Sequence, residues 1–242
     1  MDTTTPSFAP PRNRPVLPSW RLTVEEAQTL SPAVRRIRFA ASGLETMAWT
    51  PGQDLVLNLP DAPRRHYTVR VLREGSLDID FVLHGHGPAA AWAKDVRVGD
   101  EIEAVGPRGR TRLAADADWH LFLGDETCIP AIFAMLEVLP KGVPATAFIE
   151  IGSAEEKQPL STTDDLDLTW VIRGGPAQPN SLLLDRLKRF QPPAGVGHAY
   201  LIGETSGVRA QRHYLLEHGW TPERITAEGY WRPGRLGGHD HV

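Results

Sequence analysis

The chain has 242 residues, of which 41% are hydrophobic and 23% charged, and its formal net charge is −4. These values are typical of a soluble globular protein with one large or two modest domains, and they provide no overall attraction for nucleic acid. The single cysteine, Cys128, excludes an intrachain disulfide, and no apolar run reaches the ~20 residues of a membrane span, so we expect a cytoplasmic protein.

The first half of the chain has the pattern of an all-β domain. Residues 1–18 are rich in proline and lack the apolar centre of a secretory signal, which predicts a flexible leader. From residue 19 to residue 113, short alternating runs are separated by glycine and proline turns, as in an antiparallel sheet or small barrel. The clearest run is "LDIDFVLH", which places Leu77, Ile79 and Phe81 on one face and the two aspartates on the other.

The second half alternates between strands and helices. Apolar runs such as "HLFLG", "ATAFIEIG", "LTWVIRG", "HAYLIG" and "ITAEGYW" are interleaved with amphipathic stretches such as "IPAIFAMLEVL" and "SGVRAQRHYLLEHG". This alternation predicts a doubly wound parallel sheet over residues 117–235, with a tail at 236–242. A barrel followed by such a domain often forms a site in the cleft between the two.

The stretch "RRHYTVR" opens a predicted strand with an unusual density of cations. Arg65 and Tyr67 would share one face, and Thr68 and Arg70 the other. A flat ring could stack on Tyr67 and hydrogen-bond to Thr68 while Arg65 binds a phosphate. The alternative is a solvated edge strand whose cations prevent aggregation. Within this stretch we expect Arg64 and His66 to be surface residues. The same two interpretations apply to the 22 arginines as a whole, which indicate either bidentate anion recognition or codon bias.

The stretch "HGHGPAAAWA" predicts a glycine turn that leads into a helix, with Pro88 at its first position. The N-terminus of such a helix suits a diphosphate, although a plain turn before a short helix fits equally well. Four histidines, at positions 84, 86, 239 and 241, could suggest a metal. No cysteine or spaced carboxylate completes a ligand set, so we expect no metal site.

The motif "LGDETCIP" follows the first parallel strand, where nucleotides bind in open α/β sheets. Gly124 would allow close approach, and Thr127 could hydrogen-bond a phosphate or the nicotinamide amide. Asp125 and Glu126 suit ribose hydroxyls, helix capping or the cleft better than a diphosphate. The motif lacks the three-glycine dinucleotide fingerprint, and we expect Cys128 to pack under the helix.

The motif "GETSGVR" starts a later helix in the same way, with Glu204 and Thr205 at its beginning. Arg209 and Arg212 share a face of that helix, either for binding or for surface salt bridges.

Taken in order, "RHYTVR", "DFVLHGHGPAAAWA", "GPRG", "GDET", "GETSGVR" and "GYWRPG" resemble the siderophore-interacting protein family. These are FAD-dependent ferric-siderophore reductases of the ferredoxin–NADP reductase superfamily, and the resemblance spans Trp20 to Arg235. It implies an N-terminal antiparallel Greek-key β-barrel that binds FAD, followed by a doubly wound parallel α/β domain that binds NADPH or NADH.

The resemblance also implies which residues bind the cofactors. The FAD set is Arg65, Tyr67, Thr68, Arg70, His84, Gly85, Gly87, Pro88, Ala89 and Trp92, where Trp92 either shields the adenine or packs the helix. The NAD(P)H set is Gly124, Asp125, Glu126, Thr127, Arg173, Glu204, Thr205, Arg209, Tyr230 and Trp231. Within it, Arg173 would favour NADPH, bind the common diphosphate, or be only a strand-end cation. Tyr230 or Trp231 would cover the flavin, guide the nicotinamide, or pack the last strand.

The implied reaction is transfer of a hydride from NAD(P)H to FAD, and then of electrons to a ferric siderophore, which releases iron(II). Because the cofactor supplies the chemistry, no catalytic side chain is expected. Arg232 and Arg235, together with Arg173, would form a basic substrate rim. The family often has a basic residue where this chain has "GQDLVLNLP", so the substrate is either attracted elsewhere or less anionic. The alternatives are a general NAD(P)H–flavin or ferredoxin-type reductase, without an iron–sulfur cluster of its own, and a non-catalytic siderophore-binding module.

Overall fold

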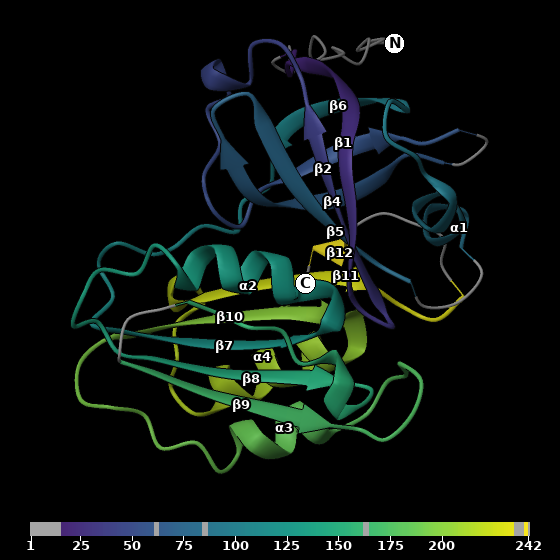
Figure 1. Ribbon diagram of the computed structural model, residues 1–242. Coiled ribbons are helices and arrows are strands. Elements are labelled where there is room, and N and C mark those ends of the chain that lie inside the picture. Colours follow the sequence, from purple (N-terminus) through teal and green to yellow (C-terminus); the bar gives the residue numbers. More distant parts are fainter. Residues whose placement is uncertain (1–15, 61–62, 84–86, 162–164, 235–239, 242) are drawn as a thin grey trace, which may run out of the picture.

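The computed structural model describes residues 16–60, 63–83, 87–161, 165–234 and 240–241 (Figure 1). None of the helices in these segments has the length and hydropathy that crossing a bilayer requires. The described chain forms a barrel and a mixed sheet, with one helix between them.

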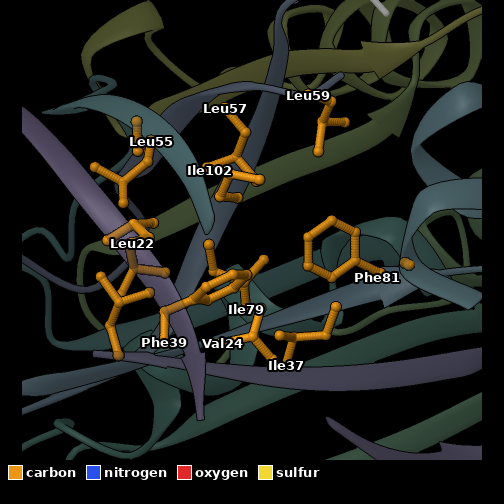
Figure 2. Close-up of a cluster of buried hydrophobic side chains, with 14 of the residues drawn as sticks. Leu22, Val24, Ile37, Phe39, Leu55, Leu57, Leu59, Ile79, Phe81 and Ile102 are labelled. Atoms are coloured by element: carbon orange, nitrogen blue, oxygen red, sulfur yellow. The ribbon is translucent and has the colours of Figure 1, made fainter. Parts of the chain in front are cut away.

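Six antiparallel strands close into the barrel in the order β1-β2-β5-β4-β3-β6. Their bounds are β1 Ser19–Ser31, β2 Val34–Ala40, β3 Asp54–Asn58, β4 Arg65–Arg73, β5 Ser76–Val82 and β6 Glu101–Arg108. The side chains of Leu22, Ile37, Phe39, Ile79 and Phe81 fill the interior and are wholly buried (Figure 2). The predicted N-terminal antiparallel barrel is confirmed.

Strand β5 is buried on both faces, unlike the half-exposed strand that its alternation suggests. Asp78 and Asp80 are 0% and 4% exposed because arginines cover them. Asp80 lies in register with Arg36 of β2 and accepts a hydrogen bond from its Nε at 2.6 Å. Asp78 lies in register with Arg38 and accepts a hydrogen bond from its Nε at 2.9 Å. Several of the 22 arginines therefore serve the barrel wall.

The second sheet has the order β12-β11-β10-β7-β8-β9, and its five long strands are parallel. Their bounds are β7 Trp119–Asp125, β8 Ala145–Ile151, β9 Leu166–Ile172, β10 Gly197–Glu204 and β11 Ile225–Trp231, while the short β12, Asp240–His241, is antiparallel to β11. Helices cover both faces, each with its own buried cluster, so the predicted doubly wound domain is confirmed.

Helix α2 (Ile129–Leu136) lies on the face of the sheet toward the barrel, and α3 (Leu182–Leu187) and α4 (Thr205–Glu217) lie on the other (Figure 1). Helix α1 (Pro88–Asp95) packs beside the barrel, and the carbonyls of Ala93 and Lys94 in its last turn accept hydrogen bonds from Arg35. Four short 3-10 helices complete the fold: η1 Leu44–Thr46, η2 Glu126–Cys128, η3 Ala154–Glu156 and η4 Pro222–Arg224.

The barrel and the sheet meet through close contacts around α2. Arg70 of β4 donates both terminal nitrogens to the Glu137 carboxylate at the end of α2, at 2.6 and 2.5 Å. Gly52 has a φ of +96°, and a Cβ there would lie 2.7 Å from the carbonyl oxygen of Thr111. Thr111 in turn donates to Glu228 of β11 at 2.6 Å. The two halves are therefore joined by buried polar contacts as well as by packing.

Candidate functional site

Alternation along β4 separates the predicted flavin-binding residues into two groups. Tyr67 packs against the barrel core, with its ring centroid 4.3 Å from that of Phe81, and burial raises its pKa to about 12. Thr68 and Arg70 face the second domain, where both are buried. One side of β4 therefore faces the barrel end, and the other side faces the domain interface.

Arg65 opens β4, and its guanidinium donates to two neighbouring carbonyl oxygens. Its Nη1 donates to the carbonyls of Pro63 and Arg64 at 3.3 and 3.2 Å. Within the described segments it makes no ion pair. A guanidinium in this setting suits a phosphate, which it binds by charge-assisted hydrogen bonds.

His66, which the sequence suggested as a surface residue, is instead partly buried. Its Nδ1 contacts the carboxylate of Asp54 on the neighbouring strand β3, and the two side chains are 17% and 5% exposed. Arg64 is exposed, as expected.

The N-terminus of α1 is open to an anion. Gly87 is its N-cap residue, with no side-chain cap, and Pro88 and Ala89 follow in a first turn that holds no acidic residue. A Cβ on Gly87 would meet nothing within 4 Å. The uncapped N–H groups and the helix dipole together favour a negatively charged group here. His84 and Gly85, assigned to the same site, lie outside the described residues.

Trp92 of α1 packs on the barrel. Its ring lies nearly parallel to that of Phe39, with centroids 6.4 Å apart, and 5.6 Å from that of Phe81. These contacts correspond to the packing role that the sequence left open.

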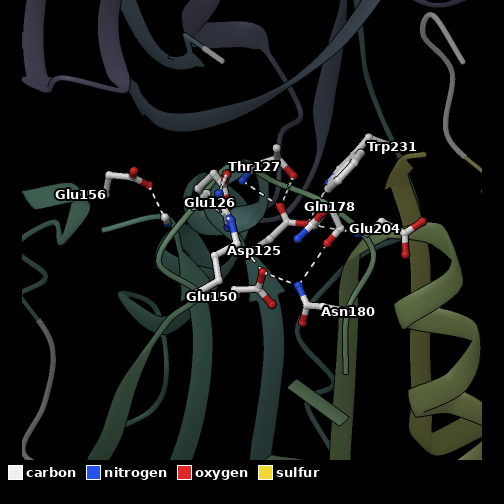
Figure 3. A network of polar contacts seen from close by, with 12 residues as sticks. Asp125, Glu126, Thr127, Glu150, Glu156, Gln178, Asn180, Glu204 and Trp231 are labelled. Atoms are coloured by element: carbon white, nitrogen blue, oxygen red, sulfur yellow. Dashed lines mark hydrogen bonds and ion pairs between the residues drawn. The ribbon is translucent and has the colours of Figure 1, made fainter. Parts of the chain in front are cut away.

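Asp125 joins the ends of three strands in the second domain (Figure 3). It is 5% exposed and accepts hydrogen bonds from the backbone N–H and hydroxyl of Thr127, from the N–H of Glu204 and from the indole of Trp231, the last two at 3.0 and 2.8 Å. Burial, and then the nearby Glu126 carboxylate, raise its pKa. Gly203 has a φ of +143°, and a Cβ there would lie 2.6 Å from the carboxylate, so this glycine makes room for Asp125.

Arg173 is engaged by two carboxylates. Its terminal nitrogens donate to both oxygens of Glu126 at 2.8 and 2.6 Å and reach Glu150 at 3.4 Å, and its side chain is 7% exposed. Glu150 also accepts from Asn180 at 2.8 Å, and burial raises its pKa. The sequence did not reveal that Arg173 would be matched by carboxylates from the neighbouring strand ends.

Glu204 caps α4 with its own carboxylate. It accepts from the N–H of Gly207 at 2.8 Å and from the hydroxyl of Ser206 at 2.5 Å. Thr205 is buried and donates to the carbonyl of Trp231, while Arg209 lies exposed further along the helix. Because a carboxylate already occupies this helix N-terminus, the site suits hydroxyl groups better than a phosphate.

Gly124 serves the packing of α2. A Cβ there would lie 2.8 Å from Ile132 and 2.9 Å from Cys128, and Cys128 is wholly buried, with its pKa raised by burial. No group of three histidine, cysteine or acidic residues within the described ranges is arranged to hold a metal ion.

The aromatic pair at the end of β11 points in two directions. Tyr230 packs with the α2 cluster, and burial raises the pKa of its phenol, whereas the indole of Trp231 donates to Asp125. Arg232, a predicted rim residue, is exposed, and Arg235 lies outside the described residues.

Two cavities adjoin at Arg173. The larger, about 670 Å³, lies between the barrel and the carboxyl ends of β8 and β9 and is lined by Ala33, Val82, Glu126, Gly152, Ser153, Ala154, Glu156, Ile172, Arg173, Gly174, Gly175, Pro176 and Ala177. The smaller, about 30 Å³, lies between the ends of β7 and β10, where the strand order reverses, and Trp231 and Glu204 border it. The reversal point of an open α/β sheet is where nucleotides bind.

Comparison with known families assigns the two halves of the chain separately. Residues 57–111 match the siderophore-interacting FAD-binding domain, and residues 117–234 match the siderophore-interacting protein model. The chain belongs to the siderophore-interacting protein family. The family resemblance inferred from the motifs is thereby confirmed.

Individual relatives agree with this membership. The chain is 33% identical over 201 residues to the ferric vibriobactin reductase ViuB of Vibrio cholerae, and this alignment covers 81% of this chain and 74% of the relative. It is 28% identical over 192 residues to the NADPH-dependent ferric-chelate reductase of Escherichia coli, covering 77% and 70%. The crystal structure of a siderophore utilization protein from T. fusca superposes with a TM-score of 0.85 at 29% identity, over 91% of this chain and 95% of the other.

Proposed function

We propose that this protein is an FAD-containing, NAD(P)H-dependent reductase of ferric siderophores. The observation that carries the proposal is the uncapped N-terminus of α1, which suits an anion and lies on the half that matches an FAD-binding domain. The Arg65 guanidinium on the same half supports it. Relatives of similar length are named as ferric reductases, which supports the same activity.

The described residues fit FAD. In this proposal Arg65 and the first turn of α1, with Gly87, Pro88 and Ala89, bind the diphosphate. Tyr67 and Thr68 lie beside the flavin ring, and residues 19–113 form the FAD domain. When bound, FAD supplies the conversion of a two-electron hydride into the single electrons that ferric ions accept.

The second domain, residues 117–235 in this proposal, binds NAD(P)H across the reversal point of its sheet. Glu204 and Asn180 border the smaller cavity there and suit ribose hydroxyls. Arg173 is the cation shared by both cavities, and a phosphate would have to compete for it with the Glu126 carboxylate. Trp231, held by Asp125, forms one wall for the nicotinamide.

The substrate in this proposal is a ferric siderophore at the exposed edge of the flavin. Electron transfer there requires proximity rather than a protein ligand to iron, so a shallow basic rim suffices. Arg232 and Arg235 are the residues that we assign to it. Hard oxygen ligands hold iron(II) more weakly than iron(III), which favours release after reduction.

The test is anaerobic visible spectroscopy of the purified protein. We expect a yellow protein with one FAD per chain, which NADPH or NADH bleaches and a ferric siderophore re-oxidises. A colourless protein that binds no added FAD would indicate a non-catalytic module. Bleaching without faster re-oxidation by ferric siderophores than by buffer would indicate a general NAD(P)H–flavin reductase.

A further inference from the structure

Arg173 borders both cavities at the carboxyl ends of the sheet strands. Among the described residues that line these cavities, it is the only lysine or arginine. A phosphate bound in either cavity would therefore have to use this guanidinium or do without a cation. Because a guanidinium binds a phosphate most strongly through two parallel hydrogen bonds, the partners of Arg173 decide how well the cavities accept one.

The donors of Arg173 are already engaged. Its terminal nitrogens donate to the two oxygens of Glu126, at 2.8 and 2.6 Å, and one of them also reaches Glu150 at 3.4 Å. Its Nε donates to the carbonyl of Gly175 at 2.9 Å. The Glu126 pair uses the same two-pronged geometry that a phosphate would need. A phosphate that displaced Glu126 would leave a carboxylate that is 3% exposed without its cation, which is unfavourable because the charge is desolvated.

Two backbone N–H groups beside the cavities are engaged in the same way. The N–H of Gly152, just after β8, donates to the Glu156 carboxylate at 3.1 Å. The N–H of Gly207, in the first turn of α4, donates to the Glu204 carboxylate at 2.8 Å. Unoccupied N–H groups at helix starts commonly bind phosphates. A carboxylate in that place accepts a hydrogen bond from a hydroxyl but repels a phosphate.

The formal charge of the cavity walls is negative. Their carboxylates are Asp125, Glu126, Glu150, Glu156 and Glu204 (Figure 3). Burial raises the pKa values of Asp125 and Glu150, so these two are left out of the count. The other three carry three negative charges against the single positive charge of Arg173, which leaves a formal charge of −2. Walls with this charge favour the ligand that has fewer phosphates.

NADH and NADPH differ at one position. The 2′ carbon of the adenosine ribose carries a hydroxyl in NADH and a phosphate in NADPH, whereas the diphosphate is common to both. In dinucleotide-binding sheets an acidic side chain that bonds to the 2′-hydroxyl favours NAD, and an available arginine accommodates the 2′-phosphate of NADP. This chain has both residue types together, and the carboxylate holds the arginine.

We propose that Glu126 determines the nicotinamide specificity of this protein, because it engages Arg173 and withholds it from a 2′-phosphate, so that NADH is preferred to NADPH. The inference rests on the proposed function, since it requires NAD(P)H at these strand ends. It would distinguish this chain from the Escherichia coli relative, which is named as NADPH-dependent.

The test measures binding of NAD⁺ and NADP⁺ to the FAD-loaded protein by isothermal titration calorimetry. We expect the wild type to bind NAD⁺ about tenfold more tightly than NADP⁺. Glu126→Gln removes the charge that engages Arg173 and should tighten NADP⁺ binding about tenfold, with NAD⁺ binding within about twofold of the wild type. Glu217→Gln, which removes an equal charge at the far end of α4, is the matched control and should leave both affinities unchanged.

Glu156→Gln is a second variant, in case Glu126→Gln does not fold. Glu156 is only half-buried, and glutamine keeps an oxygen that can accept from the N–H of Gly152. Loss of its charge should shift the preference toward NADP⁺ by about threefold, less than in Glu126→Gln, because water screens this charge more. Anaerobic bleaching of the flavin should follow the same order, through KM for NADPH rather than kcat.

Three outcomes would overturn the inference. The first is a wild type that binds NADP⁺ as tightly as NAD⁺ or more tightly. The second is a folded Glu126→Gln variant that keeps the wild-type ratio of the two affinities. The third is an equal loss of affinity for both nucleotides in that variant, which would indicate a structural role only. If neither nucleotide binds to the wild type, the proposed function itself is wrong.

Discussion

Substituting Glu137 by glutamine leaves the guanidinium of Arg70 at the domain interface without its charged partner. The Arg70 side chain is 5% exposed, and its Nε already has no hydrogen-bond partner among the described residues. Both of its terminal nitrogens depend on the Glu137 carboxylate. The face of the Phe133 ring, 5.7 Å away, also stabilises the charge.

The expected loss follows from how far water reaches the pair. Removing one partner of a fully buried ion pair costs about 3–5 kcal/mol. Because the Glu137 side chain is 32% exposed, water can partly replace it, and we expect Glu137→Gln to lower the free energy of unfolding by about 2 kcal/mol. The control is the more exposed pair of Arg38 with Glu26, whose side chains are 35% and 53% exposed. Glu26→Gln should lower the free energy of unfolding by about 0.5 kcal/mol or less.

The assay is urea unfolding followed by tryptophan fluorescence and circular dichroism, with coincident transitions required before the free energies are compared. Combining Glu137→Gln with Arg70→Met removes the unpaired charge, so the two losses should be less than additive. If Glu137→Gln costs no more than Glu26→Gln, the interface pair does not stabilise the docking of the two halves and the reasoning fails.

Three further results are expected. Arg65→Met should weaken FAD binding about tenfold in a fluorescence titration, because it removes a charge-assisted bond to phosphate, and unchanged affinity would place the diphosphate elsewhere. Gly124→Ala should lower stability by about 1–3 kcal/mol in thermal unfolding, because its Cβ would lie 2.8 Å from Ile132, and an unchanged melting temperature would show that the helix adjusts freely. Burial, and then the charge of His198, lower the pKa of His120 from 6.5 to about 4. As the pH falls, this histidine is therefore protonated in the unfolded chain before it is protonated in the folded protein. The free energy of unfolding should fall by up to about 3 kcal/mol between pH 6.5 and pH 4. His120→Phe should flatten that part of the pH profile, and an equally steep profile in the variant would contradict this assignment.

Sequence periodicity was sufficient for the architecture because short strands between turns predict a barrel, and apolar strands that alternate with amphipathic helices predict a doubly wound sheet. The alternation in "LDIDFVLH" placed Leu77, Ile79 and Phe81 correctly in the barrel. It could not show that Asp78 and Asp80 are buried too, since their burial depends on arginines of β2 brought into register by the fold. Alternating arginines in one strand and alternating aspartates in another were the available signal.

The site residues were harder to predict because their partners lie far apart in the chain. For Arg173 the sequence left open a role toward NADPH, toward the common diphosphate, or as a strand-end cation. It could not show that Glu126, 47 positions earlier, holds Arg173 with two short bonds. Asp125 was considered as a ribose ligand, a helix cap or a residue facing the cleft, and its bond to Trp231 spans 106 positions. Local pattern identifies which residues end a strand, whereas the topology decides which strand ends meet.

The stoichiometry of iron(II) release tests the central claim most directly. With FAD bound, NAD(P)H in excess and a ferric siderophore supplied anaerobically, an iron(II)-specific chelator should report about two iron(II) ions per NAD(P)H oxidised, because one hydride carries two electrons and each ferric ion accepts one. The rate should depend on FAD occupancy and fall with Arg65→Met. Oxidation of NAD(P)H without iron(II), or iron(II) release that is independent of FAD, would contradict the account.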